Sequence, residues 1–408
     1  MTQADNAAAR QGIDPAFIVI LGGVSAALHV GKLPAALPAL QAAMSITLVQ
    51  AGFLLSLVQL AGMTLGLATG LAADGLGLRR SMLCGLLILA VAGLLGGWAQ
   101  DATSLLCLRA VEGFGVLLAS MPAPSLIRRL VPPQRLAAML GLWGAYMPLG
   151  TSIALLSGPL VIGLTGWQGW WWLVAGLSFM AAVLMLRVPP DEPWSRRASH
   201  GAATQQAWPR RLKQTLSARG PWLVALSFAM YSGQWLAVVG FLPSIYAQAG
   251  VSGATTGVLT AVAAAVNIVG NIASGRLLQR GARPEALLYG GFVAMGIGAV
   301  IAYAGIGGVA APPAMRYAAV IVFSMLGGMI PGTLFSLAVR LAPDDRTVST
   351  TVGWMQQCSA LGQFAGPPLV GWVASRAGGW EWTWVVTGTC SILGIFLARL
   401  TGRLLRSQ

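Results

Sequence analysis

Four ionisable side chains lie within two runs of otherwise apolar residues. His29 and Lys32 are three residues apart in one run, and Arg109 and Glu112 are three residues apart in the other, so each pair shares one face of a helix. If these runs span a membrane, placing each charge in the bilayer costs free energy, and such residues are therefore candidates for a functional role. Pairing Arg109 with Glu112 lowers this free-energy cost. A carboxyl group beside an arginine can also take up and release a proton. We therefore interpret Glu112 as a candidate proton carrier paired with Arg109, and His29 and Lys32 as substrate-binding residues.

Each pair also has a structural alternative. Lys32 lies in the outer half of its run, where its long side chain can snorkel to the lipid headgroups. Arg109 and Glu112 can form a purely structural ion pair near the outer end of their span. Within the spans, the cationic residues His29, Lys32 and Arg109 face one acid, and this balance favours an anionic or polar substrate over a cationic drug.

The elements that must position these residues are membrane spans. The chain is 56% hydrophobic and 9% charged, with a mean hydropathy of +0.74, which is far from the composition of a soluble domain. Its apolar runs are long enough to cross a hydrocarbon core of about 30 Å as helices, and they lack the alternation of barrel strands. The sequence predicts an all-α membrane protein with twelve transmembrane helices, approximately 16–38, 47–73, 81–100, 103–129, 136–163, 167–187, 221–246, 254–276, 286–306, 314–340, 347–374 and 382–402.

The basic residues are unevenly distributed between the loops. The net charge is +14, but the arginines lie in short loops between apolar runs, so they indicate topology and not a nucleic-acid surface. Of the 25 basic residues, 21 fall in the two tails, the loops after even-numbered spans and the central polar segment; Lys32, Arg109, Arg316 and Arg376 are the exceptions. Because cytoplasmic loops carry the excess of Lys and Arg, we expect a multi-pass protein of a bacterial inner (plasma) membrane with both termini in the cytoplasm.

The chain contains an internal repeat. A polar segment, 188–219, separates an N-terminal six-helix bundle, 1–187, from a C-terminal six-helix bundle, 220–408, and we interpret it as a cytoplasmic linker. Matches that preserve order support the repeat, and Pro38 pairs with Pro243 at an offset of 205 residues. Six spans in each half make the repeat parallel, with a pseudo-twofold axis along the membrane normal and a substrate site near the midplane.

The repeat identifies further candidates for the substrate site, because a cavity on a pseudo-twofold axis is lined by equivalent helices. His29 with Gln234, and Tyr146 with Gln357, occupy equivalent positions in the two halves. Other polar and aromatic residues lie on the same expected surfaces, and some of them must serve interhelical packing alone. The predicted substrate-binding residues are His29, Lys32, Tyr146, Tyr231, Gln234, Trp235, Asn267 and Gln357.

The loop between the second and third spans resembles a loop motif of the major facilitator superfamily, Gly-x-x-x-Asp-(Arg/Lys)-x-Gly-(Arg/Lys)-(Arg/Lys). Asp74, Gly77 and Arg79 match this motif, whereas Gly75 and Leu78 stand where the family has basic residues. The resemblance extends over essentially the whole chain. It implies a transporter made of two six-helix bundles.

The same resemblance implies a gate on the cytoplasmic side. Asp74 would face the N-terminal end of the eleventh span, where the helix dipole favours an anion. Arg79 and Arg80 would pair with Asp344 or Asp345, just before that helix. The structural alternative is a solvated turn that only sets the topology.

Three other spans resemble parts of the family. Arg109, Glu112 and the glycines after them are similar to the pattern Arg-x-x-Gln-Gly-x-Gly, whose arginine is linked to proton transfer in proton-coupled relatives. Gly158 and Pro159 belong to a partial version of the glycine-rich motif of drug:proton antiporters. The seventh span, within residues 221–246, weakly resembles the cyanate and nitroimidazole transporter-like branch of the superfamily.

Together these features predict a proton-coupled secondary transporter that moves a small polar or anionic organic solute across the inner membrane by alternating access. The main alternative is a proton antiporter that exports drugs, siderophores or other amphipathic compounds. Two histidines and no Ser/His pair at membrane depth argue against an enzyme, and the lack of a phosphate loop argues against a primary pump. We expect no cofactor, no metal and no nucleic-acid partner; the proton gradient supplies the energy, and a monomer meets its solute within the lipid bilayer.

Overall fold

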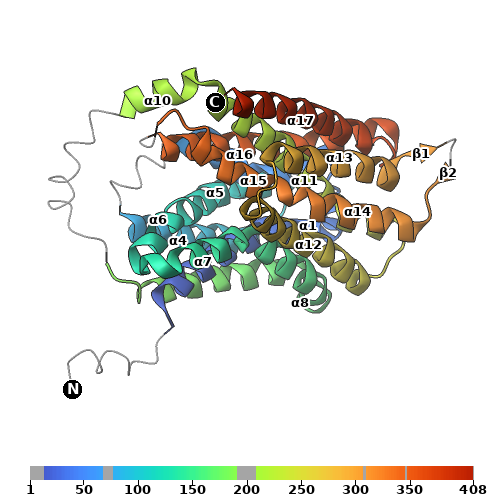
Figure 1. Cartoon of the computed structure of the whole chain (residues 1–408). Coiled ribbons are helices and arrows are strands. Elements are labelled where there is room, and N and C mark those ends of the chain that lie inside the picture. Colours follow the sequence, from blue (N-terminus) through green and yellow to red (C-terminus); the bar gives the residue numbers. More distant parts are fainter. Residues whose placement is uncertain (1–12, 68–76, 191–207, 307–308, 345–346, 408) are drawn as a thin grey trace.

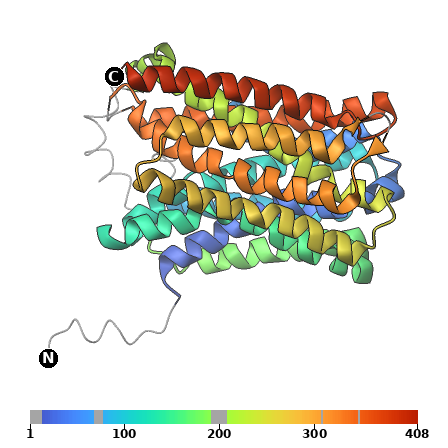
Figure 2. The same cartoon turned by 45° about the vertical axis from the view of Figure 1, so that its right-hand side comes forward.

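The computed structural model describes residues 13–67, 77–190, 208–306, 309–344 and 347–407. Its long helices lie side by side along one common axis (Figure 1). The beginning of α1 (Pro15–Met44) and the end of α17 (Thr383–Arg406) lie at the same end of this bundle, which we call the terminal face. A small hairpin of β1 (Gly305–Ile306) and β2 (Val309–Ala310) lies at the opposite end (Figures 1 and 2).

The helices before residue 190 pack mainly against one another. α1 packs along α8, while α4 packs against both α5 and α8. After α1, the elements of this half are α2 (Leu48–Ser56), the 3₁₀ helix η1 (Leu57–Gln59), α4 (Leu78–Gly96), α5 (Ala102–Ser120), α6 (Ala123–Leu130), α7 (Pro133–Gly144) and α8 (Tyr146–Met185).

The second half repeats this arrangement. α11 packs along α16, and α13 packs against α14 and α17. Its helices before α17 are α10 (Trp208–Ser217), α11 (Arg219–Gln248), α12 (Gly253–Gln279), α13 (Pro284–Tyr303), α14 (Pro313–Gly327), α15 (Met329–Arg340) and α16 (Val348–Ala377).

The predicted twelve spans are confirmed by helices in the expected places. Ten helical stretches of the described residues are long and apolar enough to cross a membrane. One of them, α8, contains two spans, because Gly166 takes a left-handed φ of 74° that other residues rarely adopt and so interrupts the helix. α16 completes the twelve, although its glutamines and its two prolines, Pro367 and Pro368, lower its hydropathy.

Local sequence explains where several helices begin. Asp101 precedes α5 and accepts hydrogen bonds from the backbone N–H and the hydroxyl of Ser104, both at 2.8 Å. These hydrogen bonds hold the pKa of the exposed Asp101 carboxyl below its ordinary value. Thr47 and Gln50 form a reciprocal capping box at the start of α2. The predicted ends of the spans were approximate, and several differ by a few residues: the first helix continues to Met44 and not to 38, and the ninth span ends at Tyr303 and not at 306, where the β1 strand follows from Gly305.

The two halves contact each other along three pairs of helices. α8 packs on α12, α2 packs on α16, and α1 packs on α11. Small residues allow the close approach of α2 and α16: a Cβ atom added to Gly52 would lie 2.7 Å from the Pro367 carbonyl oxygen, and one added to Gly371 would lie 2.4 Å from the Leu48 carbonyl oxygen. Beyond the prolines of α1, Ser244 of α11 donates a hydrogen bond to Gln41, 3.2 Å away.

Candidate functional site

The four ionisable residues predicted from the sequence meet inside the first half of the bundle. We call His29, Lys32, Arg109 and Glu112 the ionisable cluster; each is at most 1% exposed. One carboxylate oxygen of Glu112 accepts from Lys32 Nζ, and the other accepts from Arg109 Nη1 at 2.5 Å. His29 Nδ1 lies 3.3 Å from the oxygen that Lys32 contacts. The i, i+3 pair of Arg109 and Glu112 is thus formed as the sequence predicted.

Lys32 does not snorkel to the surface. Its ammonium contacts Glu112, donates to His29 Nδ1 at 3.2 Å, and lies 4.7 Å from the centroid of the Trp171 ring. Because an ammonium group can only donate, His29 Nδ1 is the acceptor, and the neutral ring carries its proton on Nε2. That nitrogen donates to the hydroxyl of Ser178, 2.8 Å away.

Arg109 joins the three helical segments around the cluster. Its Nε donates to the carbonyl of Leu54 at 3.2 Å, and its Nη1 donates to the carbonyl of His29 at 2.8 Å. The span that contains Leu54 narrows to a 3₁₀ turn at η1, immediately after α2, and such a turn changes which backbone carbonyls are paired within the helix. A guanidinium group with three fixed donors therefore holds α5 against α1 and α2.

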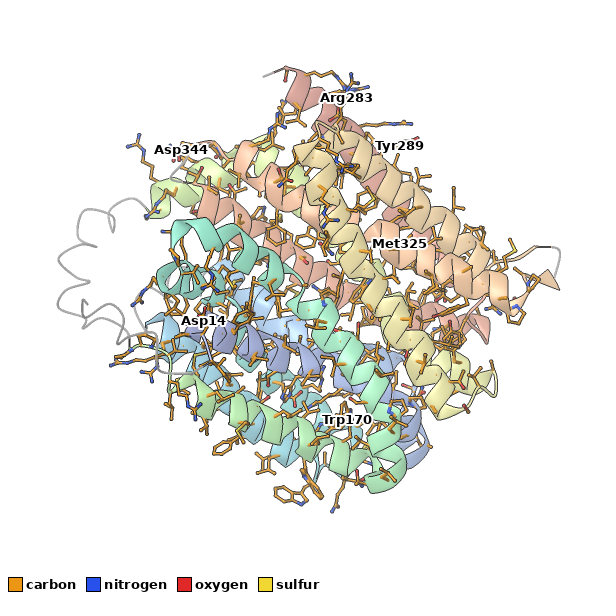
Figure 3. All side chains as sticks on the ribbon, turned by 60° about the horizontal axis from the view of Figure 1, so that its bottom comes forward. Asp14, Trp170, Arg283, Tyr289, Met325 and Asp344 are labelled. Atoms are coloured by element: carbon orange, nitrogen blue, oxygen red, sulfur yellow. The ribbon has the colours of Figure 1, made fainter. Side chains whose placement is uncertain are left out.

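α8 closes the cluster from the other side. Trp170 donates from Nε1 to the carbonyl of Lys32 at 3.0 Å, and it lies near the turn of α8, away from Asp14 at the start of α1 (Figure 3). Ser178 also forms a hydrogen bond with Ser25, 2.9 Å away, so its hydroxyl joins α8 to two side chains of α1, those of Ser25 and His29. The cluster is thereby buried between α1, α5 and α8.

The second half carries a buried polar network without formal charge. We call Tyr231, Trp235, Asn267, Asn271 and Ser324 the amide network. Asn267 bonds the hydroxyl of Tyr231 at 2.9 Å and the carbonyl of Ser324 at 2.9 Å, and it accepts from Asn271 at 3.0 Å. Trp235 donates to the hydroxyl of Ser324 at 3.1 Å. Three predicted residues, Tyr231, Trp235 and Asn267, thus lie together, across α11, α12 and α14.

The repeat is visible in the contacts as well as in the sequence. Gln234, which is the equivalent of His29, accepts from Ser391 of α17 at 3.1 Å, just as His29 bonds Ser178 of the equivalent α8 segment. Leu259 is the equivalent of Leu54 at the same offset of 205 residues, and its carbonyl accepts from Tyr317 at 3.1 Å. The second half therefore keeps two of these contacts and makes them with neutral side chains.

Gln357 bridges the two halves. Its Nε2 donates to the carbonyl of Met63 at 2.8 Å, and its Oε1 accepts from the N–H of Leu67 at 3.1 Å. Further along the same pair of helices, Gln59 donates to Gln363 at 2.9 Å. The equivalent residue Tyr146 stacks instead on Trp143 of its own half, with a ring separation of 4.2 Å. The structure thus distributes the eight predicted substrate residues over separate groups.

The predicted gate is only partly described. Asp74 and Asp345 lie outside the described residues. Arg79 donates to the carbonyls of Met185 and Leu186, at 3.2 and 2.8 Å, so it binds the C-terminal end of α8, where the helix dipole favours a cation. Arg80 lies beside it in the first turn of α4, and Asp344 lies at the end of the bundle that also carries Asp14 (Figure 3). Pairing of Arg79 and Arg80 with Asp344 or Asp345 stays a prediction.

Several residues of the site were not anticipated from the sequence. Ser178 and Trp171 of α8 contact the ionisable cluster, and Ser324 joins the amide network. A serine or tryptophan in a chain rich in apolar residues carries little signal by itself. The repeat offers one signal for Ser178, because Ser391 occupies the matching helix and makes the matching contact.

Comparison with known proteins identifies the family. A family model described as Major Facilitator Superfamily matches residues 19–358. The chain is 26% identical over 387 residues to the 2-nitroimidazole transporter of Escherichia coli (strain K12), which covers 90% of each protein. It is 25% identical over 184 residues to the cyanate transport protein CynX of the same strain, covering 45% of this chain and 46% of the relative.

Other similarities are partial or concern the fold alone. The chain is 29% identical to the puromycin resistance protein pur8 of Streptomyces alboniger over 46% of this chain and 39% of the relative. It therefore spans less than two thirds of several curated relatives. The solved structure of a bacterial homolog to the human lysosomal transporter Spinster, inward-facing and occupied, superposes with a TM-score of 0.79 at 15% identity over 95% of this chain and 96% of the other. By its family match over residues 19–358 and its fold, the chain belongs to the major facilitator superfamily and is a multi-pass membrane protein.

Proposed function

We propose that the chain is a proton-coupled secondary transporter that carries a small polar or anionic organic solute across a bacterial inner membrane by alternating access. The proton gradient would supply the energy. One observation carries the proposal: the buried carboxylate of Glu112 is shared by Lys32 and Arg109. When a proton binds to a buried acid between two cations, the acid loses the negative charge that attracts both of them.

Protonation of Glu112 would remove the charge that holds the two cations together. Lys32 belongs to α1 and Arg109 to α5, so their pairing with one carboxylate ties these helices to each other. Breaking a buried ion pair is worth roughly 3–5 kcal/mol. That range approaches the ~5.5 kcal/mol needed to move a two-state equilibrium from 1:99 to 99:1. If the ion pairs are intact in one access state and broken in the other, one proton on Glu112 would shift the balance between the two states by up to the free energy of breaking them.

The solute would bind between the ionisable cluster and the amide network. Lys32 brings a cationic donor and His29 a neutral imidazole from the first half, and Tyr231, Trp235 and Asn267 bring neutral donors and acceptors from the second. This pairing of charged and neutral groups suits a small solute with one anionic or strongly polar end. The relatives named for 2-nitroimidazole and cyanate transport support the same class.

Export of amphipathic compounds is the second candidate function. The similarity to a puromycin resistance protein favours it, as does Pro159 of the Gly158–Pro159 step, which leaves little room at Gly257 of the other half: a Cβ atom added there would lie 3.1 Å from the proline ring. Growth of an expressing strain on puromycin separates the two candidates. Resistance that depends on Glu112 would favour export of drugs, whereas unchanged sensitivity together with uptake of small anions would favour the first proposal.

The orientation follows from the basic residues. Arg79, Arg80 and Arg135 lie at the terminal face, and short cytoplasmic loops carry the excess of such residues. We propose that the terminal face is cytoplasmic. Reaction of a single introduced cysteine near Ser407 with an impermeant thiol reagent, in right-side-out against inside-out vesicles, tests this orientation.

Replacement of Glu112 by Gln tests the proton coupling. In proteoliposomes with an imposed pH gradient, Glu112→Gln should lose accumulation of 2-nitroimidazole or cyanate by about tenfold or more, because a neutral amide cannot exchange a proton; tenfold corresponds to ~1.4 kcal/mol of lost coupling. Exchange of labelled for unlabelled solute, which needs no net proton movement, should remain.

Glu285→Gln is the matched control. Glu285 pairs with Arg406 at 3.4 Å at the terminal face, so the same chemical change there should leave gradient-driven accumulation unaltered. Full gradient-driven accumulation by Glu112→Gln would remove Glu112 from the coupling role.

A further inference from the structure

Arg109 has unused donors in a fully buried position. Of its five N–H groups, the one on Nε bonds Leu54 and the two on Nη1 are directed to His29 and Glu112. Nη2 has no hydrogen-bond partner among the residues that the structure describes, and the side chain is 0% exposed. A buried, charged donor without a partner carries a large desolvation penalty, so a ligand that accepts from it gains that energy.

The charge of the ionisable cluster is also unbalanced. Lys32 and Arg109 contribute two positive charges, Glu112 contributes one negative charge, and His29 is neutral with its proton on Nε2. The enclosed cluster therefore carries a net charge of about +1, and an excess charge inside a protein is expensive unless a counter-ion balances it. One monoanion would bring the cluster to neutrality.

We propose that the ionisable cluster binds a monoanion through Nη2 of Arg109, and that protonation of Glu112 strengthens this binding. The inference rests on the proposed transport function and narrows its solute to a small organic or inorganic anion of charge −1, such as a carboxylate, sulfonate or cyanate. A protonated Glu112 raises the net charge of the cluster to about +2 and releases Lys32 and Arg109 Nη1 toward the ligand. Proton and anion then bind together, and their combined movement is electrically neutral.

The groups around Glu112 fix the sign of the pH dependence. It is faced by His29 and Lys32 from α1 and by Arg109 from α5. From α8, the neutral side chains of Ser178 and Trp171 contact the cluster. The other ionisable side chains of the adjacent α4 and α5 are Arg79, Arg80, Cys84 and Cys107, and both thiols are exposed. Every charged neighbour of Glu112 is cationic. Anion affinity should therefore rise as the pH falls, because the added proton removes the negative charge of the ionisable cluster.

Binding of a permanent anion by the purified protein tests this inference without any gradient. Benzenesulfonate stays ionised throughout the pH range, and benzenesulfonamide is its neutral partner of similar shape. Benzenesulfonate should raise the thermal unfolding temperature of the wild type more than the sulfonamide does. Its affinity should increase up to about tenfold for each unit by which the pH falls, the slope for uptake of one proton.

Two variants separate charge from geometry. Glu112→Gln imitates the protonated acid and should bind benzenesulfonate tightly at every pH. Arg109→Lys keeps the positive charge but lacks Nη2 and should bind it at least about tenfold more weakly. Size-exclusion chromatography would reveal whether Arg109→Lys fails to fold. In that case, the pH dependence of benzenesulfonate affinity in the wild type, compared with that in Glu112→Gln, tests the inference without this variant.

Equal stabilisation by the sulfonate and the sulfonamide, or no stabilisation by either, would overturn the inference. So would a wild-type affinity that does not change with pH. None of these outcomes would disprove proton coupling, since gradient-driven accumulation that depends on Glu112 is measured separately. Loss of that dependence, with anion binding intact, would instead disprove the proposed function.

Discussion

Glu112 is the residue on which the charge balance of the ionisable cluster depends. It is the single acid among three basic side chains, and each of its oxygens holds a different cation. Removing its charge leaves two cations facing each other in a dry site, whereas removing the charge of Lys32 leaves a balanced pair of Arg109 and Glu112. The two substitutions should therefore have unequal effects on stability.

Thermal unfolding of three variants measures this inequality. Glu112→Gln should lower the free energy of unfolding by about 3–5 kcal/mol, because it strips two buried cations of their partner. Lys32→Met should cost distinctly less, and the double variant should recover part of the loss, because it restores a smaller net charge. Equal losses that simply add in the double variant would show that the two residues are not coupled.

Part of this site could be predicted from sequence alone. The spacing of Arg109 and Glu112 places them on one helix face, so their ion pair follows from the helix period. That Lys32 shares the same carboxylate does not follow, because it depends on how α1 packs against α5, which are far apart in the chain. For the same reason Ser178, supplied by a third helix, was missed.

The pairing of α16 with the span Leu48–Leu67 is the main contact between the halves toward the terminal face. Gln357 caps this contact with two hydrogen bonds to backbone groups, those of Met63 and Leu67. Met63 and Leu67 are four residues apart, so the amide of Gln357 bonds two backbone groups that would otherwise pair within their own helix. These hydrogen bonds join α16 to the span Leu48–Leu67 and must break when the halves separate. The sequence marked Gln357 as a substrate ligand, and the structure shows it in interhelical contact.

Weakening this bridge should open the terminal face. We predict that Gln357→Ala raises, by several-fold, the rate at which an impermeant thiol reagent modifies a cysteine placed at Ala360, in a background without the four native cysteines. Each lost hydrogen bond is worth about 1 kcal/mol, which is roughly a fivefold change in an opening equilibrium. Gln356→Ala, at the neighbouring position, is the control. An unchanged rate in Gln357→Ala would show that the bridge does not limit opening.

The two halves of the molecule are held together at positions that can be linked covalently. A Cβ atom added to Gly62 would lie 3.0 Å from the Cβ atom of Ala360 in the other half. This separation is about 0.5 Å below the range of relaxed disulfides, so the two helices must move apart by that amount for the bond to form. A link at this place would prevent the halves from moving apart.

Cross-linking therefore tests alternating access. The pair Gly62→Cys with Ala360→Cys should lose nearly all transport of 2-nitroimidazole or cyanate upon oxidation and regain it upon reduction. Each single-cysteine variant should transport equally well under both conditions. Undiminished transport by the fully cross-linked pair would show that these two helices need not separate.

The fold as a whole was predictable, because apolar runs and the parity of the spans follow from the chemistry of the bilayer. The internal repeat added the equivalence of His29 and Gln234, and their matching bonds to Ser178 and Ser391 bear it out. The substrate groups were less predictable: Tyr146 and Gln357 occupy equivalent positions yet make different contacts, because one stacks within its own half and the other crosses to the opposite half.

Proton movement during transport tests the central claim most directly. With a pH-sensitive dye enclosed in proteoliposomes, addition of 2-nitroimidazole or cyanate to one side should produce a proton flux in the wild type and in Glu285→Gln. Glu112→Gln should carry the solute in exchange but produce no proton flux, because its amide cannot bind the proton. A flux of wild-type size in Glu112→Gln would contradict the account that this carboxylate carries the proton.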